Sequence, residues 1–267
     1  MRRLLSLNFR RRITTLVWLQ RLIWLPLAAV IVAGISARPR SVPQSAFWIA
    51  LALFAVLQIA LRHWELSTRR MFILQAHFPG YLVDKLCTAY PQLERRDADL
   101  VLRGLREFFL AHLRSGRKFV AMPSRLADAA WHEFILHTRA YQLWCRIAFG
   151  RLLHHSPAEV LGADARRNDG LRRTWYWACR AESIDPRAPS RLPLLFALDR
   201  KYAIPGGFSY IPDCRDINRQ AGSGVYCGSE FGASDGASGD AASFGGSESD
   251  SGADGGSGDS DGGCGGD

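Results

Sequence analysis

The sequence predicts an all-α protein: a two-helix transmembrane hairpin, then a cytoplasmic helical domain, then a disordered tail rich in Gly, Ser and Asp. Three observations support this fold class. Long uncharged stretches lie near the N-terminus, apolar residues recur three and four positions apart through the middle, and the last 47 residues are of low complexity. Period-two alternation is too short anywhere to require a sheet.

The formal net charge of +9 combines three unlike segments. Residues 1–70 hold eleven Arg and one acid, residues 71–220 hold 23 basic and 15 acidic residues, and residues 221–267 hold nine acids and no base. One uniform soluble domain is therefore excluded, and these three ranges are the predicted domains. Only the middle range is long and mixed enough to bury a core of ordinary domain size.

Two membrane spans are predicted in the first domain. Residues 41–61 carry no charge and would form a helix of about 31 Å, close to the hydrocarbon thickness of a bilayer. Residues 22–37 are also uncharged but short, so the first span is extended back to about residue 14. This extension admits Arg21, which can reach the headgroups from near a helix end. A signal peptide cleaved after Ala37 is the alternative for this first segment.

The arginines around the two spans predict the topology. Five precede the first span and three follow the second, whereas the connecting loop holds only Arg38 and Arg40. Since positively charged loops stay inside, both termini are expected in the cytoplasm of a multi-pass inner-membrane protein. The lipid bilayer is then one partner, and its anionic inner leaflet explains the basic residues nearby.

Six cysteines are present, and none forms a C-x-x-C motif. In a cytoplasmic domain they are expected to be free thiols, several of them buried as small apolar side chains.

The middle domain is predicted to be helical throughout. Residues 97–115 place apolar side chains on one helical face, and Asp97 or Asp99 can cap that helix. The other expected helices cover residues 81–90, a long run from Ser124 to Phe149, residues 168–179 and residues 192–202. Residues 118–122 are expected to be an extended connector.

Residues 122–157 are the densest cluster of chemically active side chains. The zincin pattern fails here, because His132 and His137 are five residues apart and point about 140° away from each other on one helix. Asp128 and His132, four residues apart, share a face and can pair. The candidate metal ligands are His132, His137, Cys145, His154 and His155, with Asp128 as a partner behind His132. The competing interpretation is that these side chains only pack and hydrogen-bond within a helical core.

The run MPS-x3-D-x2-WHEFILHT at residues 122–138 resembles the glycine-rich domain-containing-protein-like family. Tyr141, Cys145, Gly150 and His154-His155 continue the resemblance, as do LPLLFALD at 192–199 and Gly206-Gly207. It covers about residues 75–215 and implies no particular reaction. Plant members of that family are linked to stress responses, and some carry an RNA-binding segment that is not identifiable in this sequence.

These features favour a membrane-anchored, non-enzymatic interaction or scaffold module with an unidentified protein partner. No nucleophile elbow, Ser/His/Asp order or phosphate loop is identifiable, so no catalytic and no cofactor-binding residue is predicted. The alternative is a domain that binds a transition metal such as zinc or iron. RNA binding is a lesser alternative, since the basic residues are dispersed and no nucleic-acid fold signature is present.

Overall fold

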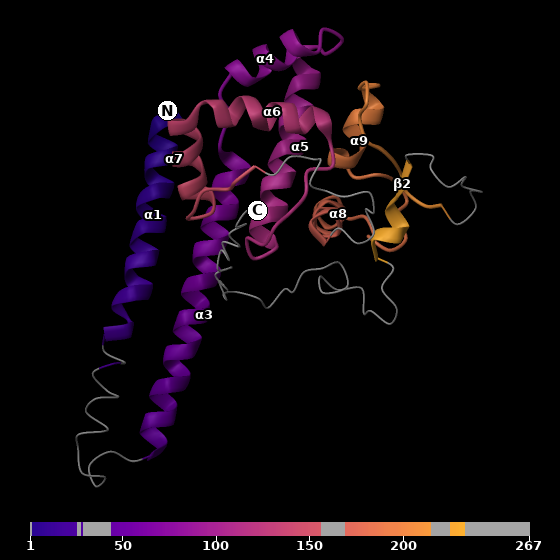
Figure 1. The fold of residues 1–267 in the computed structure, drawn as a ribbon. Coiled ribbons are helices and arrows are strands. Elements are labelled where there is room, and N and C mark those ends of the chain that lie inside the picture. The colour runs from indigo at the N-terminus through magenta and orange to yellow at the C-terminus, as the bar shows by residue number, and fades with distance from the viewer. Residues whose placement is uncertain (1, 26–27, 29–43, 156–168, 215–224, 233–267) are drawn as a thin grey trace, which may run out of the picture.

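We analysed a computed structural model, which describes residues 2–25, 28, 44–155, 169–214 and 225–232 (Figure 1). The described chain is mostly helical, which confirms the all-α prediction at that level. The elements are α1 (Arg2–Leu22), α3 (Gln44–Gln75), α4 (Tyr81–Ala89), α5 (Arg95–Arg114), α6 (Arg125–Leu136), α7 (Thr138–Ala148), α8 (Asp169–Ala181), α9 (Leu194–Lys201), β1 (Ser209–Ile211), β2 (Val225–Cys227) and the 3-10 helix η2 (Gly228–Gly232).

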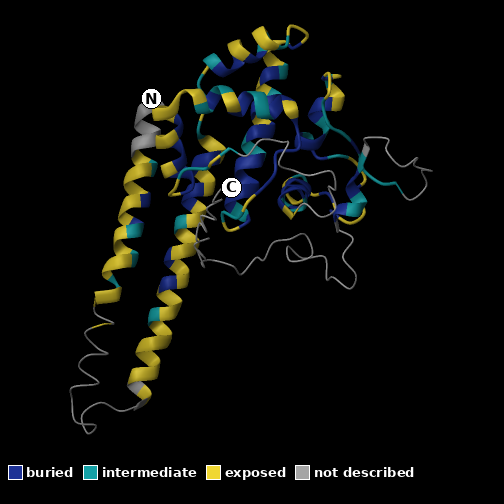
Figure 2. Ribbon diagram, viewed as in Figure 1, coloured by how far each residue is buried: buried dark blue, intermediate teal, exposed yellow. Residues whose placement is uncertain are grey.

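Helices α1 and α3 lie side by side in opposite directions and extend away from the other helices (Figure 1). Within the described residues, one helix is long and apolar enough to cross a membrane, over Phe47–Gln75. The part of α3 that extends away from the domain is largely exposed (Figure 2). Its exposed apolar residues include Trp48, Leu53 and Ile59. The predicted two-span hairpin is therefore not supported as such. Much of the predicted first span, residues 26–27 and 29–37, lies outside the described residues.

A buried arginine of α3, Arg69, joins this helix to the helical domain. The Nε of Arg69 lies 2.7 Å from Oε1 of Glu65 one turn earlier. The same guanidinium donates to the carbonyl oxygen of Ile147 at 2.7 Å and to that of Arg146 at 3.2 Å. These carbonyls belong to the C-terminal turn of α7, where a cation is favoured by the helix dipole. The candidate membrane helix is thus tied directly to the domain.

Helix α5 is the centre of the domain, and α4, α6, α8 and α9 pack around it (Figure 1). The face that the sequence predicts to be apolar is buried, including Val101, Leu105 and Phe108. Glu94 and Asp97 form a capping box at its N-terminus, so the predicted Asp97 acts at the third helical position. The helices predicted near residues 81–90, 168–179 and 192–202 are also present, as α4, α8 and α9.

The long helix expected from Ser124 to Phe149 is wrong, because the chain breaks at His137. That residue has φ −87° and ψ 61°, and it separates α6 from α7. Its ring stacks on Tyr81 with the centroids 3.9 Å apart, which holds His137 outside the helical path. The side chains of α7 are therefore not in register with those of α6.

A buried carboxylate fixes the start of α6. Asp199, at the end of α9, accepts hydrogen bonds from the Ser124 hydroxyl at 2.7 Å and from the backbone N–H of Arg125 at 2.8 Å and of Leu126 at 3.1 Å. The N–H of Phe208 completes the set at 2.9 Å. Ser124 in turn accepts from the N–H of Ala127 as the helix cap. A negative charge here also complements the positive end of the helix dipole.

The paired glycines after α9 let the chain approach that carboxylate. Gly206 has φ +65°, a conformation that favours glycine, and a Cβ on Gly207 would lie 2.8 Å from the Cβ of Asp199. Any larger residue at 207 would push the Phe208 N–H away from its acceptor.

The last described elements form a short parallel pair, in which Tyr210 lies opposite Tyr226. Residues 225–232 were assigned to the tail from the sequence, but Val225–Cys227 pair with β1 and Gly228–Gly232 pack on α8, where Phe231 is 1% exposed. The predicted disordered tail is corrected for these residues, and residues 233–267 lie outside the described residues.

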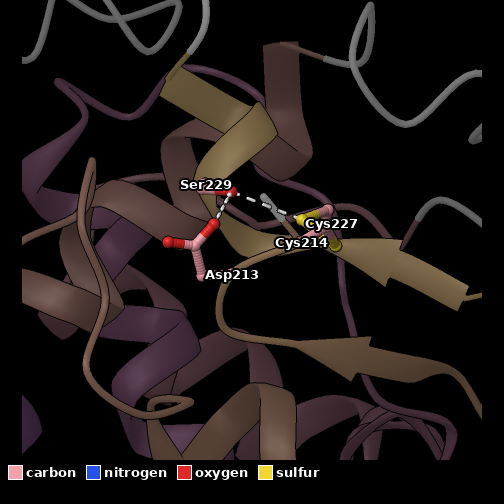
Figure 3. Close-up of a disulfide and its surroundings, with 4 residues drawn as sticks. All are labelled: Asp213, Cys214, Cys227 and Ser229. Atoms are coloured by element: carbon pink, nitrogen blue, oxygen red, sulfur yellow. Dashed lines mark hydrogen bonds between the residues drawn. A yellow bond between two sulfur atoms is a disulfide. The ribbon is translucent and has the colours of Figure 1, made fainter. Parts of the chain in front are cut away.

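A disulfide joins Cys214 to Cys227 across this pair (Figure 3). The prediction of free thiols is therefore wrong for these two residues, because the pairing of β1 with β2 brings together cysteines 13 positions apart. Cys87, Cys145 and Cys179 are free.

Burial lowers the pKa of His112, in α5, to about 4, and the positive charges of Arg151 and Arg117 act in the same direction. Its Nδ1 lies 3.0 Å from the carbonyl oxygen of Lys118, which fits a neutral ring donating from Nδ1. Because the folded-state pKa lies below the unfolded value of 6.5, stability falls as the pH drops from 6.5 to 4, by about 3 kcal/mol.

Glu107, five residues earlier in α5, shows the opposite effect. Burial and the charge of Glu182 raise its pKa to about 7, against the attraction of Arg103. A raised carboxyl pKa means that the folded state binds the proton more tightly. Stability therefore falls as the pH rises from 4.5 to 7, again by about 3 kcal/mol.

We expect the two losses to offset each other, so that together they leave the stability nearly level between pH 4.5 and 6.5. Replacing Glu107→Gln should unmask a stability loss on acidification below pH 6.5. Replacing His112→Asn, which keeps a donor for Lys118, should unmask a loss on alkalinisation above pH 4.5. Denaturant unfolding of the full chain in detergent measures both, and pH profiles parallel to that of the unmodified protein would contradict the two shifts.

Replacing Asp199→Asn should lower the free energy of unfolding by about 3 kcal/mol, since an amide can accept only part of four converging donors and adds N–H groups of its own. Asp185→Asn is the matched control, because that exposed carboxylate accepts a single N–H, from Arg187. We expect the control to change stability by less than about 1 kcal/mol. Equal effects of the two substitutions would rule out a special role for Asp199.

Candidate metal centre

Three side chains from two segments meet beside the N-terminal half of α6. Asp128 and His132 lie one turn apart on α6, and His155 lies in the segment that follows α7. His155 Nε2 is 2.8 Å from Asp128 Oδ1. His132 Nδ1 is 3.4 Å from Asp128 Oδ2 and 3.2 Å from the backbone carbonyl oxygen of Asp128. The two imidazole rings are 4.1 Å apart between centroids. The carboxylate therefore lies within reach of both rings.

A buried hydroxyl holds the segment that carries His155. Tyr141, on α7, donates to the carbonyl oxygen of Leu153 at 2.6 Å, two residues before His155. The same hydroxyl accepts from the indole N–H of Trp131 at 3.0 Å. The Trp131 ring also meets the His155 ring edge-on, with centroids 4.7 Å apart. Tyr141 and Trp131, both within the residue 122–157 cluster, thus position His155.

The three ligand atoms suit a small transition-metal ion. They lie within 4.8 Å of one another, and the two closest contacts, 2.8 and 3.4 Å, bracket the spacing of about 3.3 Å between ligands around tetrahedral zinc. The side chains of His155 and Asp128 are 13% and 19% exposed, whereas that of His132 is 57% exposed. An ion held here would have its remaining coordination positions open to solvent.

The structure reassigns Asp128 and separates the other predicted ligands. A carboxylate oxygen of Asp128 belongs to the group of three ligand atoms itself, so Asp128 would bind an ion directly instead of standing behind His132. Among the described residues, the grouping of three includes neither His137, His154 nor Cys145. His137 places its Nδ1 3.2 Å from the carbonyl oxygen of Glu133 and stacks on Tyr81. His154 is exposed, whereas its neighbour His155 is partly buried.

Cys145 is a core residue. Its side chain is buried in α7, and burial raises the pKa of its thiol. A thiol kept protonated is a poor metal ligand, because zinc and iron bind the thiolate. The structure thus places Cys145 in the packed core, outside the group formed by Asp128, His132 and His155.

Two functional features were not recognised from the sequence. The buried carboxylate Asp199, which anchors α6, had a signal in the sequence LPLLFALD followed by two glycines. The role of Tyr141 had none, because its two partners, Trp131 and Leu153, are 10 and 12 positions away.

The chain belongs to the UCP032817-like family, whose profile matches residues 68–231. This range contains the three residues of the candidate centre and the residues that position them. No curated protein and no solved structure matches the chain.

Replacing Tyr141→Phe should lower the free energy of unfolding by about 1–3 kcal/mol, because it leaves the indole N–H of Trp131 and the Leu153 carbonyl without their partner. Tyr81→Phe is the matched control, since the buried Tyr81 hydroxyl has no hydrogen-bond partner within the described residues. Thermal or denaturant unfolding of the full chain compares them. A loss no larger for Tyr141→Phe than for Tyr81→Phe would contradict the assigned role.

Proposed function

We propose that this protein is a membrane-anchored helical domain that binds one divalent transition-metal ion through Asp128, His132 and His155. The observation that carries the proposal is the convergence of two imidazoles and one carboxylate from separate segments, held by a buried tyrosine. A histidine that is merely solvated at the surface would not need the buried Tyr141 hydroxyl to hold its segment.

The ligand set favours zinc or ferrous iron. Imidazole nitrogen and carboxylate oxygen suit both ions, and a set of two histidines and one carboxylate leaves positions free on either. Calcium and magnesium prefer sites made of oxygen alone. The open side of the site is where water or a group from another molecule would complete the coordination.

A non-enzymatic interaction or scaffold module is the second candidate. It is favoured by Leu136 and Leu143, which are 70% and 46% exposed near the junction of α6 and α7. Apolar side chains outside the candidate membrane helix suit an unidentified protein partner. The two candidates are compatible, because a partner side chain could fill the open position on the metal. We also propose that the chain is related to the glycine-rich domain-containing-protein-like family. The run that contains Trp131 and His132 supports this relationship.

For the membrane topology we propose a second span over about residues 14–37, with both termini in the cytoplasm. The antiparallel course of α1 supports this, since Phe9 packs on Phe72 at 5.8 Å between ring centroids and α1 also contacts α7. The N-terminal residues then lie on the same side as the helical domain. Eight arginines flank the two spans on that side, against Arg38 and Arg40 in the connecting loop, which favours the cytoplasm as that side.

The metal proposal predicts that the full chain in detergent binds one Zn²⁺ or Fe²⁺ and unfolds at a higher temperature when loaded. His155→Ala and His132→Ala should each weaken binding at least 10-fold, because only two ligands remain. His154→Ala is the matched control, an exposed histidine adjacent in sequence, and should bind normally. Isothermal titration with each metal measures the affinities.

Binding that is absent, or equally weakened by His154→Ala, would sink the metal proposal and leave the interaction module.

A further inference from the structure

The disulfide fastens a segment that completes the core. We call residues 225–231 the strap. Its last residue, Phe231, inserts among Trp175, Phe196 and Tyr210, with ring centroids 5.4, 6.1 and 6.3 Å away. Arg172 Nε donates to the Phe231 carbonyl oxygen at 2.8 Å. The strap therefore covers one aromatic side chain from each of α8, α9 and β1.

Apart from the disulfide, the start of the strap is held by Tyr226, whose ring lies 5.5 Å from that of Tyr210 and 6.5 Å from that of Phe208 between centroids, and by a few hydrogen bonds. The strands β1 and β2 are three residues each, and the N–H of Ser229 donates to the carbonyl oxygen of Pro212 at 3.0 Å. Gly228 lies flat against Trp175, where a Cβ would be 2.4 Å from the indole ring. A disulfide that closes a loop of about 13 residues favours the closed form by about 100-fold, from loop entropy alone. The covalent bond is thus a large part of what keeps the strap in place.

We propose that the Cys214–Cys227 disulfide is a reversible redox clasp that releases the strap when it is reduced. The inference rests on the cytoplasmic orientation proposed above and is independent of the metal centre. In the cytoplasm, glutathione keeps most thiols reduced, and the disulfides that do form there are mainly transient or redox-sensing.

The two sulfurs differ in access, which sets the direction of the exchange. Cys214 is partly exposed, whereas Cys227 is buried. A glutathione thiolate attacks Sγ of Cys214, the S–S bond breaks, and the Cys227 sulfur leaves with the electron pair and takes a proton from water. A second glutathione thiolate attacks the glutathione sulfur of the mixed disulfide. The products are two protein thiols and one molecule of glutathione disulfide.

The reduced form has a hydrogen-bond partner in place. Cys227 Sγ lies 3.3 Å from the Ser229 hydroxyl oxygen, and that hydroxyl donates to Asp213 Oδ1 at 3.1 Å (Figure 3). A Cys227 thiol can therefore donate to Ser229 while Ser229 continues to donate to Asp213. Both redox states of the cysteine pair are accommodated without an unpaired buried donor at Cys227.

Hydrogen exchange of the full chain in detergent tests the clasp. Glutathione buffers of varied reduced-to-oxidised ratio set the state of the cysteine pair, and mass spectrometry follows the backbone amides of residues 225–231. We expect those amides to exchange about 100-fold faster in the reduced protein, while α5 stays protected as a folding control. The double substitution Cys214→Ser and Cys227→Ser should exchange fast in every buffer. Cys87→Ser, which changes a free thiol, should behave like the unmodified protein.

Equal protection of the strap in the reduced and oxidised protein would overturn the proposal. So would thiol trapping in intact cells that finds the pair fully oxidised both before and after mild thiol oxidation, as expected for a disulfide in the periplasm. Partial reduction that rises and falls with treatment supports the clasp. Metal titration of the Cys214→Ser/Cys227→Ser variant separates the two proposals, because its zinc affinity should equal that of the unmodified protein.

Discussion

The buried carboxylate of Asp199 determines where α6 begins, and the candidate metal centre depends on that position. Four donors from the start of α6 and from the chain after Gly207 surround it. A charge removed from water requires such compensation, so the helix start cannot shift without leaving the carboxylate unpaired. Asp128 and His132 lie within the first two turns of α6, so the position of the helix start also fixes theirs. Tyr141 fixes the position of His155 through its hydrogen bond to the Leu153 carbonyl oxygen.

The helical class was predictable because it depends on local periodicity. Local sequence patterns located α4, α5, α8 and α9. Ser124, where a helix was expected to begin, is the N-cap of α6. The break at His137 was not predictable, since it depends on stacking against Tyr81, which is 56 positions earlier in the chain. The disulfide was missed for a similar reason: cysteine spacing carries no information about which strands pair.

The types of residue in the candidate site were predictable from the sequence, but which of the candidate residues come together was not. Three of the residues singled out in the sequence, Asp128, His132 and His155, do meet. Helical spacing correctly paired Asp128 with His132, because both are on one helix. Assigning His155 in place of His137 or Cys145 required the path of the chain after α7, which is set by the Tyr141 hydroxyl and the Leu153 carbonyl.

X-ray absorption of the zinc-loaded full chain tests the central claim most directly, because it identifies the atoms around the ion. We predict two imidazole nitrogens and carboxylate or water oxygens at about 2.0–2.1 Å, with no sulfur at about 2.3 Å. A sulfur shell would bring Cys145 or another cysteine into the centre and contradict the assignment of Asp128, His132 and His155. A protein that retains no zinc would contradict the metal centre altogether.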